Sequence, residues 1–572
     1  NDHSHTGHHT CFGADKAGGP PPGREPGAGG FFKREGGGVR GGWGRVVFKK
    51  TQPPNGGAPG FAGGAPFFLQ KKASPRGNAP FICFTFQRRG AIMHGGNSRG
   101  GSALKGNTAV NCDLTVGKPQ KVLLFYILPL LGSALFQQFY TLADTIIAGK
   151  FAGQTALTAI GASNSIVNIL MAVALGANAG CAVLVSRYFG AKEHAKVRSA
   201  ITTALLSFFV LSCVLLLAGV LSCEPVLQAL KTPEAAMEDS VTYLNIYYYG
   251  LPFLILYNLG TGIFSALGDS KTPFLFLVAS SLANIFLDWV MVKPWGVAGV
   301  AWATFLAQGA ACILTLFFVY RRLKGFVSEE KAPLFSGTLL KTLLLLSIPV
   351  ILQNSFVSVG NLVIQVRINE LANAEGIGIT SGFTSGFKLL VFSTTCFNAC
   401  ATGLTNYVSQ NFGANKFHRI RQGFLWGLII STALTACFVA VSMLAATPLV
   451  SLFMPGGEQD TALALQTGVE YIRLTAPFFF VVNVKIMADA TVRGCNGNVG
   501  FMVSTFSDLI LRVVFVFLLT PFMGFTGVGW AWDIGWVLGT AIALAFYFAI
   551  PCLRKRNLQK YDKDDRLLPA AV

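Results

Sequence analysis

Charged residues are scarce in this chain, and most of it lacks any long polar stretch. Of its 572 residues, 12% are Asp, Glu, Lys or Arg, whereas 52% are hydrophobic and 48 are phenylalanine. Soluble domains carry about twice that share of charge. Hydrophobic runs of about 20 residues, the length that crosses a bilayer, recur from Val122 to Leu553. The composition excludes a string of soluble domains and predicts one polytopic, all-α membrane protein.

Metal-binding and catalytic spacings are also lacking. The twelve cysteines are scattered, and no His-Glu-x-x-His pattern or credible Ser/His pair is present. Residues 96–100 match G-x-S-x-G formally, but no predicted strand precedes them and no predicted helix follows. His194 and His418 lie in basic loops, which favours an interfacial role. We therefore expect no enzyme, no cofactor and no metal beyond a coupling ion.

Residues 1–117 differ from the rest of the chain and show neither helical nor strand periodicity. They hold 27 of the 64 glycines, and their 15 Lys and Arg against five acids supply about half of the net charge of +19. Two interpretations follow: a disordered basic tail, or upstream sequence outside the native protein. The lack of even low-complexity regularity favours the second. The remaining positive charge lies in short loops, so we expect no nucleic-acid partner.

Twelve candidate spans follow this leader, and Gly or Pro marks most of the joins between them. The spans are 122–148, 158–186, 196–221, 239–267, 273–292, 296–320, 338–368, 379–410, 418–445, 468–493, 499–520 and 525–552. One set of loops holds most of the Lys and Arg, as does the tail at 554–572. The positive-inside rule then places both termini in the cytoplasm of a multi-pass cell-membrane protein.

The two halves of the membrane part resemble each other. VSRYFGA from Val185 is answered by VSQNFGA from Val408, and GVAGVAWA from Gly296 by GFTGVGWA from Gly524. Pro129 and Pro252 are answered by Pro349 and Pro477. Six spans per half predict parallel repeats around a central cavity, an architecture that suits alternating access. The predicted parts are an N-lobe at 118–325, a cytoplasmic linker at 326–337 and a C-lobe at 338–553.

The span at 273–292 carries two polar side chains deep inside it. Asn284 and Asp288 are four residues apart, so they share one helix face with Cβ atoms roughly 6 Å apart. Counted at about 1.5 Å per residue, Asp288, Asp144 and Thr304 all reach the outer half of the bilayer. Two carboxylates at one low-dielectric site cannot both stay ionised cheaply. The cluster therefore suits coupling to H⁺ or Na⁺.

These features resemble the multidrug and toxic compound extrusion (MATE) family. The likeness rests on PLLGSALFQQFYTLADTIIAGKFAGQTALTAIG, the VSRYFGAKEHAKVR loop, the N-x-x-x-D span and G-V-x-G-V-x-W-A-T, and covers about residues 118–552. It implies a two-lobed, cation-coupled antiporter that expels organic cations or related amphipathic compounds. It also implies a cation site in the first lobe at Asp144, Asn284 and Asp288, with Thr304 as its fourth member.

Other intramembrane polar residues are candidates for the substrate cavity. Gln137 and Tyr140 lie seven and four residues before Asp144, so they share its helix face. Packing inside the bundle explains them equally well. Weaker candidates are Asn164, Asn168 and Asn258.

The second half departs from the first at the cation site. Asn284 and Asp288 align with Asp508 and Arg512, an offset of 224 that replaces a carboxylate by a cation. That pair can neutralise itself, so we expect a structural ion pair there and coupling in the first lobe alone. Asp533 remains as an extra acid in the last span.

The function predicted from these observations is export of small amphipathic or cationic molecules by a monomer in the lipid bilayer. The alternative is a flippase for lipid-linked oligosaccharides or other lipids. Such a flippase would be expected to line its cavity with more Arg and Lys than these spans offer. An intramembrane enzyme or a receptor has no supporting motif or ligand domain.

Overall fold

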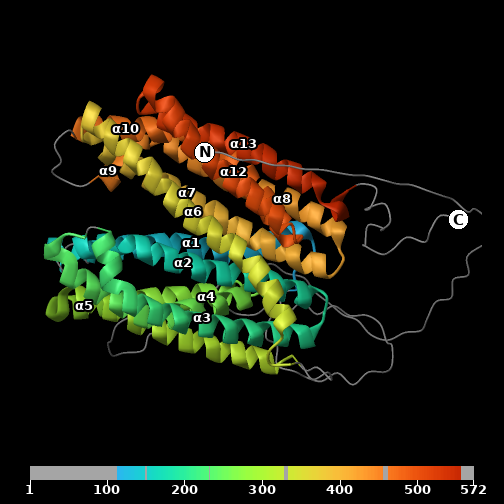
Figure 1. Ribbon diagram of the computed structural model, residues 1–572. Coiled ribbons are helices and arrows are strands. Elements are labelled where there is room, and N and C mark those ends of the chain that lie inside the picture. The colour runs from blue at the N-terminus through green and yellow to red at the C-terminus, as the bar shows by residue number, and fades with distance from the viewer. Residues whose placement is uncertain are drawn as a thin grey trace, which may run out of the picture. The chain divides into compact units, whose positions relative to one another are not determined.

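The computed structural model describes residues 113–147, 151, 153–230, 232–326, 333–454 and 461–554, and every regular element in these ranges is a helix (Figure 1). In chain order these are α1 (Pro119–Ile147), α2 (Gly153–Gly190), α3 (His194–Ala229), α4 (Glu234–Ala266), α5 (Lys271–Lys324), α6 (Gly337–Glu375), α7 (Gly378–Gly413), α8 (Phe417–Leu444), α9 (Ala446–Phe453), α10 (Thr461–Thr475), η2 (Ala476–Phe478), α11 (Phe479–Gly494), α12 (Asn498–Met523), α13 (Thr526–Ala549) and η3 (Pro551–Leu553).

Ten of these helical stretches are long and apolar enough to cross a membrane, and they account for eleven spans. α5 is one of the ten but makes two crossings, because its 54 residues fold back at Gly296 (φ 53°, ψ −127°). α4 is the twelfth: it has 33 residues and packs against α2, α3 and α5. α10, η2 and α11 form a single span interrupted at Pro477. The predicted twelve-span, all-α fold is confirmed.

The predicted internal repeat is visible in the backbone. Gly524 (φ 56°, ψ −140°) has nearly the same conformation as Gly296, and each lies where two spans of its lobe meet. The turns after α2 and α7 also match, since Lys192 and Asn415 have φ values of 60° and 58°. Positive φ is uncommon for residues other than glycine. Two sequences that differ at most positions thus adopt the same unusual turns.

The helices form two lobes, α1–α5 and α6–α13, but α1 and α6 each pack against both (Figure 1). Near the start of α1, Leu123 and Ile127 belong to the same apolar core as Leu404 of α7. Near the start of α6, Leu343 and Leu346 belong to the core of the first lobe. The lobes therefore share two helices at the ends that the charge pattern predicts to be cytoplasmic.

The predicted leader at 1–117 needs a correction at its end. Residues 1–112 lie outside the described residues, as does the tail from 555 onward. Within Asp113–Gly117, however, two side chains are buried: Leu114 is 1% exposed and Thr115 is 4% exposed, whereas Val116 is 60% exposed. Because these side chains are buried, the folded part of the chain begins before residue 118.

Candidate cation site in the first lobe

The two arms of α5 bring the predicted cation residues together. The backbone of Gly296 turns the chain so that the second arm returns along the first. A Cβ on Gly299 would overlap the carbonyl of Met291, so the two arms are in close contact at this turn. As a result Thr304 lies beside Asn284, twenty residues earlier in the chain, with 3.5 Å between its Oγ1 and the nearer terminal atom of the Asn284 amide.

Asn284 is the centre of this cluster. When its amide oxygen faces the second arm, it accepts from the Thr304 backbone N–H at 3.3 Å. Its nitrogen then donates to the hydroxyl of Tyr140 at 2.6 Å and to Asp288 Oδ2 at 3.2 Å. The amide orientation of an asparagine is assigned from its hydrogen-bond partners, and this orientation satisfies all of them. The cluster thus joins α1 to both arms of α5.

The cluster is buried and carries a carboxylate. Asp288 is 0% exposed and Asn284 is 4% exposed, in a part of the protein surrounded by apolar helices. A buried carboxylate is costly unless a cation or donors stabilise it. Asp288, Tyr140 and Thr304 thus all contact the amide of Asn284: the Tyr140 hydroxyl and Asp288 Oδ2 lie at its nitrogen end, and the Thr304 backbone N–H lies at its oxygen end. Carboxylate and hydroxyl oxygens are hard donors, the type that suits a hard cation.

The remaining predicted residues fall into three groups. The side chain of Asp144 lies outside the described residues, although its position falls within α1, so its role stays a prediction. Gln137, Asn164 and Asn168 are exposed. Asn258 instead serves packing, since its Nδ2 donates to the Leu254 carbonyl at 2.9 Å.

Tyr140, predicted to line the substrate cavity, lies within the cation cluster.

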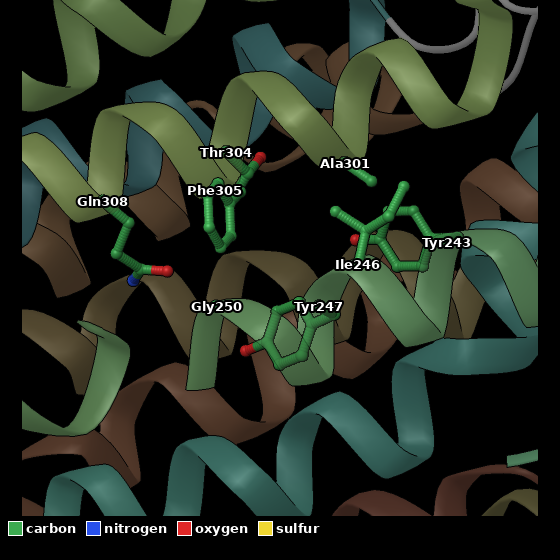
Figure 2. A pocket seen from close by; sticks show the side chains of 8 residues that line it. All are labelled: Tyr243, Ile246, Tyr247, Gly250, Ala301, Thr304, Phe305 and Gln308. Atoms are coloured by element: carbon green, nitrogen blue, oxygen red, sulfur yellow. The ribbon is translucent and has the colours of Figure 1, made fainter. Parts of the chain in front are cut away.

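A small cavity beside this cluster was not predicted. Thr304 lines this cavity together with Tyr243, Tyr247 and Gln308, between α4 and the second arm of α5 (Figure 2). Its volume of about 10 Å³ suits one water molecule. In the sequence, the pattern that could have indicated this cavity is the spacing of its residues: Gln308 follows Thr304 by one helical turn, and Tyr247 follows Tyr243 by one turn. Sequence alone does not place these two helix faces together.

In the second lobe, the predicted pair of Asp508 and Arg512 is part of a larger buried network. Arg512 Nη2 lies 3.0 Å from Asp508 Oδ2, and its guanidinium lies 3.9 Å from the ring centroid of Trp532. Lys485 Nζ lies 3.0 Å from Asp489 Oδ2 and 3.8 Å from Asp508 Oδ2. Two cations and two carboxylates therefore neutralise one another inside this lobe.

Asp533 is the one acid that this network does not satisfy. It is 0% exposed, and neither carboxylate oxygen has a hydrogen-bond partner among the described residues. It lies on the face of α13 that packs near the Pro477 interruption, because Thr540, seven residues on, donates to the Val481 carbonyl at 3.1 Å. Within the part of the second lobe that the structure describes, Asp533 is thus a buried acid outside the ion pairs.

Twelve membrane spans in two related lobes, with a buried polar cluster in the first lobe, define a polytopic membrane transporter. A family model described as MatE matches residues 129–290 and 349–518, which together make up more than half of the chain. The chain belongs to the MatE family.

Relatives support this assignment. The chain is 28% identical over 439 residues to the probable multidrug resistance protein YpnP of Bacillus subtilis, covering 76% of this chain and 96% of that protein. It is 25% identical to the FAD transporter of Shewanella oneidensis, over 58% of this chain and 74% of that protein. A solved structure described as the outward-facing conformation of a multidrug resistance MATE family transporter superposes with a TM-score of 0.73, at 20% identity, covering 79% of this chain and all of that one.

Proposed function

We propose that this protein exports amphipathic or cationic small molecules in exchange for H⁺ or Na⁺. The observation that carries the proposal is the cluster around Asp288, in which the amide of Asn284 joins a fully buried carboxylate to Tyr140 of α1 and to Thr304 of the second arm of α5. A site shared by several helices changes when those helices move. Ion binding there can therefore favour one packing of the lobes over another, which is the requirement for coupling.

The choice of export over lipid flipping follows from the positive charges. A pyrophosphate-linked lipid would need free Arg or Lys in the cavity. Lys485 and Arg512, the cations of the second lobe's network, are 5% and 7% exposed and are paired with carboxylates. The relative named as a multidrug resistance protein supports a broad range of substrates. We further propose that the protein acts as a monomer in the cell membrane with both termini cytoplasmic, as its loop charges indicate.

Removing the charge of Asp288 tests this proposal. Asp288→Asn keeps the size of the side chain but cannot bind and release a cation, so coupled efflux should fall at least tenfold. The measurement is efflux of a cationic dye from proteoliposomes, with a Na⁺ gradient and a pH gradient imposed in separate experiments. The gradient that drives efflux in the native protein identifies the coupling ion.

A matched control lies on the same helix face, two turns earlier. Ser281 is also buried, at 4% exposure, and Ser281→Ala should leave dye efflux within about twofold of the native rate. Both variants should reconstitute to the same level. Native efflux by the Asp288→Asn protein under both gradients would refute coupling at this site.

A further inference from the structure

Residues 113–117, which we call the strap, precede α1 and pack against the junction of α7 and α8. Side chains of the second lobe hold the strap by its backbone. The hydrogen bonds are Leu114 N–H to Gln410 Oε1 (3.0 Å), Asn411 Nδ2 to Leu114 O (3.3 Å), Lys416 Nζ to Thr115 O (2.8 Å) and Arg419 Nη1 to Gly117 O (2.7 Å). The strap is therefore docked at a specific site at the predicted cytoplasmic face.

Gln410 connects the strap to the opposite lobe. Its side chain is 0% exposed, and its Nε2 donates to the Ala266 carbonyl at the end of α4, at 2.7 Å. Its Oε1 is occupied by the Leu114 N–H. Because an amide has one oxygen end and one nitrogen end, the bond from Leu114 determines which end faces α4. The strap thus orients the group that joins the two lobes.

A second bridge lies beside this one. The hydroxyl of Tyr126 in α1 donates to the Ser265 carbonyl at 2.6 Å and accepts from Asn406 Nδ2 at 3.0 Å. The last carbonyls of α4 have no partner within their own helix. They accept hydrogen bonds instead from Gln410 of the second lobe and from Tyr126 of α1. Separation of the lobes at this face would break both bridges.

The internal repeat provides a comparison. The counterpart of Gln410 is Arg187, whose Nη1 lies 3.3 Å from Asn496 Oδ1 in the second lobe. At the offset of 220 defined by Pro129 and Pro349, Leu114 corresponds to Leu334. Leu334 is 73% exposed, whereas Leu114 is 1% exposed. The segment before α6 also contacts the opposite lobe, since the Ser336 N–H donates to Thr203 Oγ1 at 3.1 Å, but its Leu334 is not buried as Leu114 is.

We propose that the strap is a positioning element of a latch formed by Gln410 and Ala266, and that this latch stabilises the conformation closed at the predicted cytoplasmic face. The inference rests on the proposed function, because a latch has consequences only where the lobes alternate. Residues 113–117 would then set the balance between the two conformations without touching ion or substrate.

Two substitutions test the latch. Leu114→Pro removes the backbone donor to Gln410, and its control Leu114→Ala removes the buried side chain but keeps that donor. Gln410→Glu replaces the donor to Ala266 by an oxygen and leaves the strap's apolar contacts intact. The measurement is hydrogen–deuterium exchange of the purified full-length protein in detergent, followed at residues 183–190 and 405–413.

Leu114→Pro and Gln410→Glu should each raise exchange at these ends by about fivefold, since one hydrogen bond contributes about 1 kcal/mol net. Leu114→Ala should raise it less than Leu114→Pro does. Equal exchange in the two Leu114 variants, or native exchange in Gln410→Glu, would overturn the proposal. The measurement needs no substrate or ion gradient, so it does not depend on the outcome for Asp288→Asn.

Discussion

Asp288 in the first lobe and its repeat counterpart Arg512 carry opposite charges at the same helix position. Asp288 Oδ2 lies 3.2 Å from the amide nitrogen of Asn284, whereas Arg512 pairs with Asp508 on its own helix at 3.0 Å. The same position of the duplicated helix thus carries a buried carboxylate in one lobe and a paired cation in the other. Under the proposed function, the first is the position that takes up the coupling ion.

The buried network of the second lobe makes a stability prediction at this scale. Arg512→Met removes one partner and leaves Asp508 dependent on Lys485 at 3.8 Å, so the free energy of unfolding should fall by about 3 kcal/mol. Adding Asp508→Asn should recover part of that loss, because no unpaired charge then remains. Thermal unfolding in detergent measures both variants.

Both proteins lose the contact of Arg512 with Trp532, so their difference isolates the charge pair. A double variant that melts no higher than Arg512→Met would contradict a structural ion pair at this position.

At the scale of elements, the sequence predicted which polar residues come together better than it predicted the packing around them. The four-residue spacing of Asn284 and Asp288, and the depth of Thr304, depend only on helix geometry, and the structure brings the three together. The contacts of α1 and α6 with both lobes were not predicted, because hydrophobic periodicity shows that a face is buried but not which helix covers it. The cavity at Tyr247 and Gln308 was missed for the same reason.

The turn inside α5 makes a prediction about this element. Gly296 has a φ of 53° and a ψ of −127°, a conformation that residues with a side chain rarely adopt. No atom lies within 4 Å of a Cβ built at this position, so Gly296→Ala tests backbone conformation without a steric clash. The substitution should cost about 1–3 kcal/mol and displace Thr304 from Asn284, which lowers both the melting temperature and the coupled dye efflux.

The control is Gly161→Ala in α2, where a Cβ also meets no atom within 4 Å and the backbone has no positive φ. It should leave melting temperature and efflux near the native values. If Gly296→Ala behaves like this control, the turn does not depend on glycine and the cluster is not positioned by it.

At the scale of the whole molecule, the repeat forms a reciprocal contact between the lobes. A Cβ on Gly190, at the end of α2, would overlap the backbone of Gln410, and a Cβ on Gly413, at the end of α7, would overlap that of Arg187. These four residues are two pairs of repeat counterparts, each offset by 223. The contact is therefore nearly symmetric, and it closes the face that the loop charges predict to be cytoplasmic.

Alanine at either glycine should shift the protein toward the conformation open at this face, because backbone atoms cannot move aside as a flexible side chain can. Spin labels at Arg198 and Arg421, exposed counterparts near the starts of α3 and α8, report the separation of the lobes by pulsed electron resonance. Labels attached through p-acetylphenylalanine avoid the native cysteines. Gly190→Ala and Gly413→Ala should each increase the population of long distances.

Gly337→Ala is the control for these two variants, since it lies at the start of α6 with open space around its Cβ and should leave the distances unchanged. Similar shifts from Gly190→Ala and Gly413→Ala would mean that both halves of the repeat contribute equally to closure. Unchanged distances in both would contradict closure through this contact. A shift in only one of them would show that the symmetry of the backbone does not extend to the energetics.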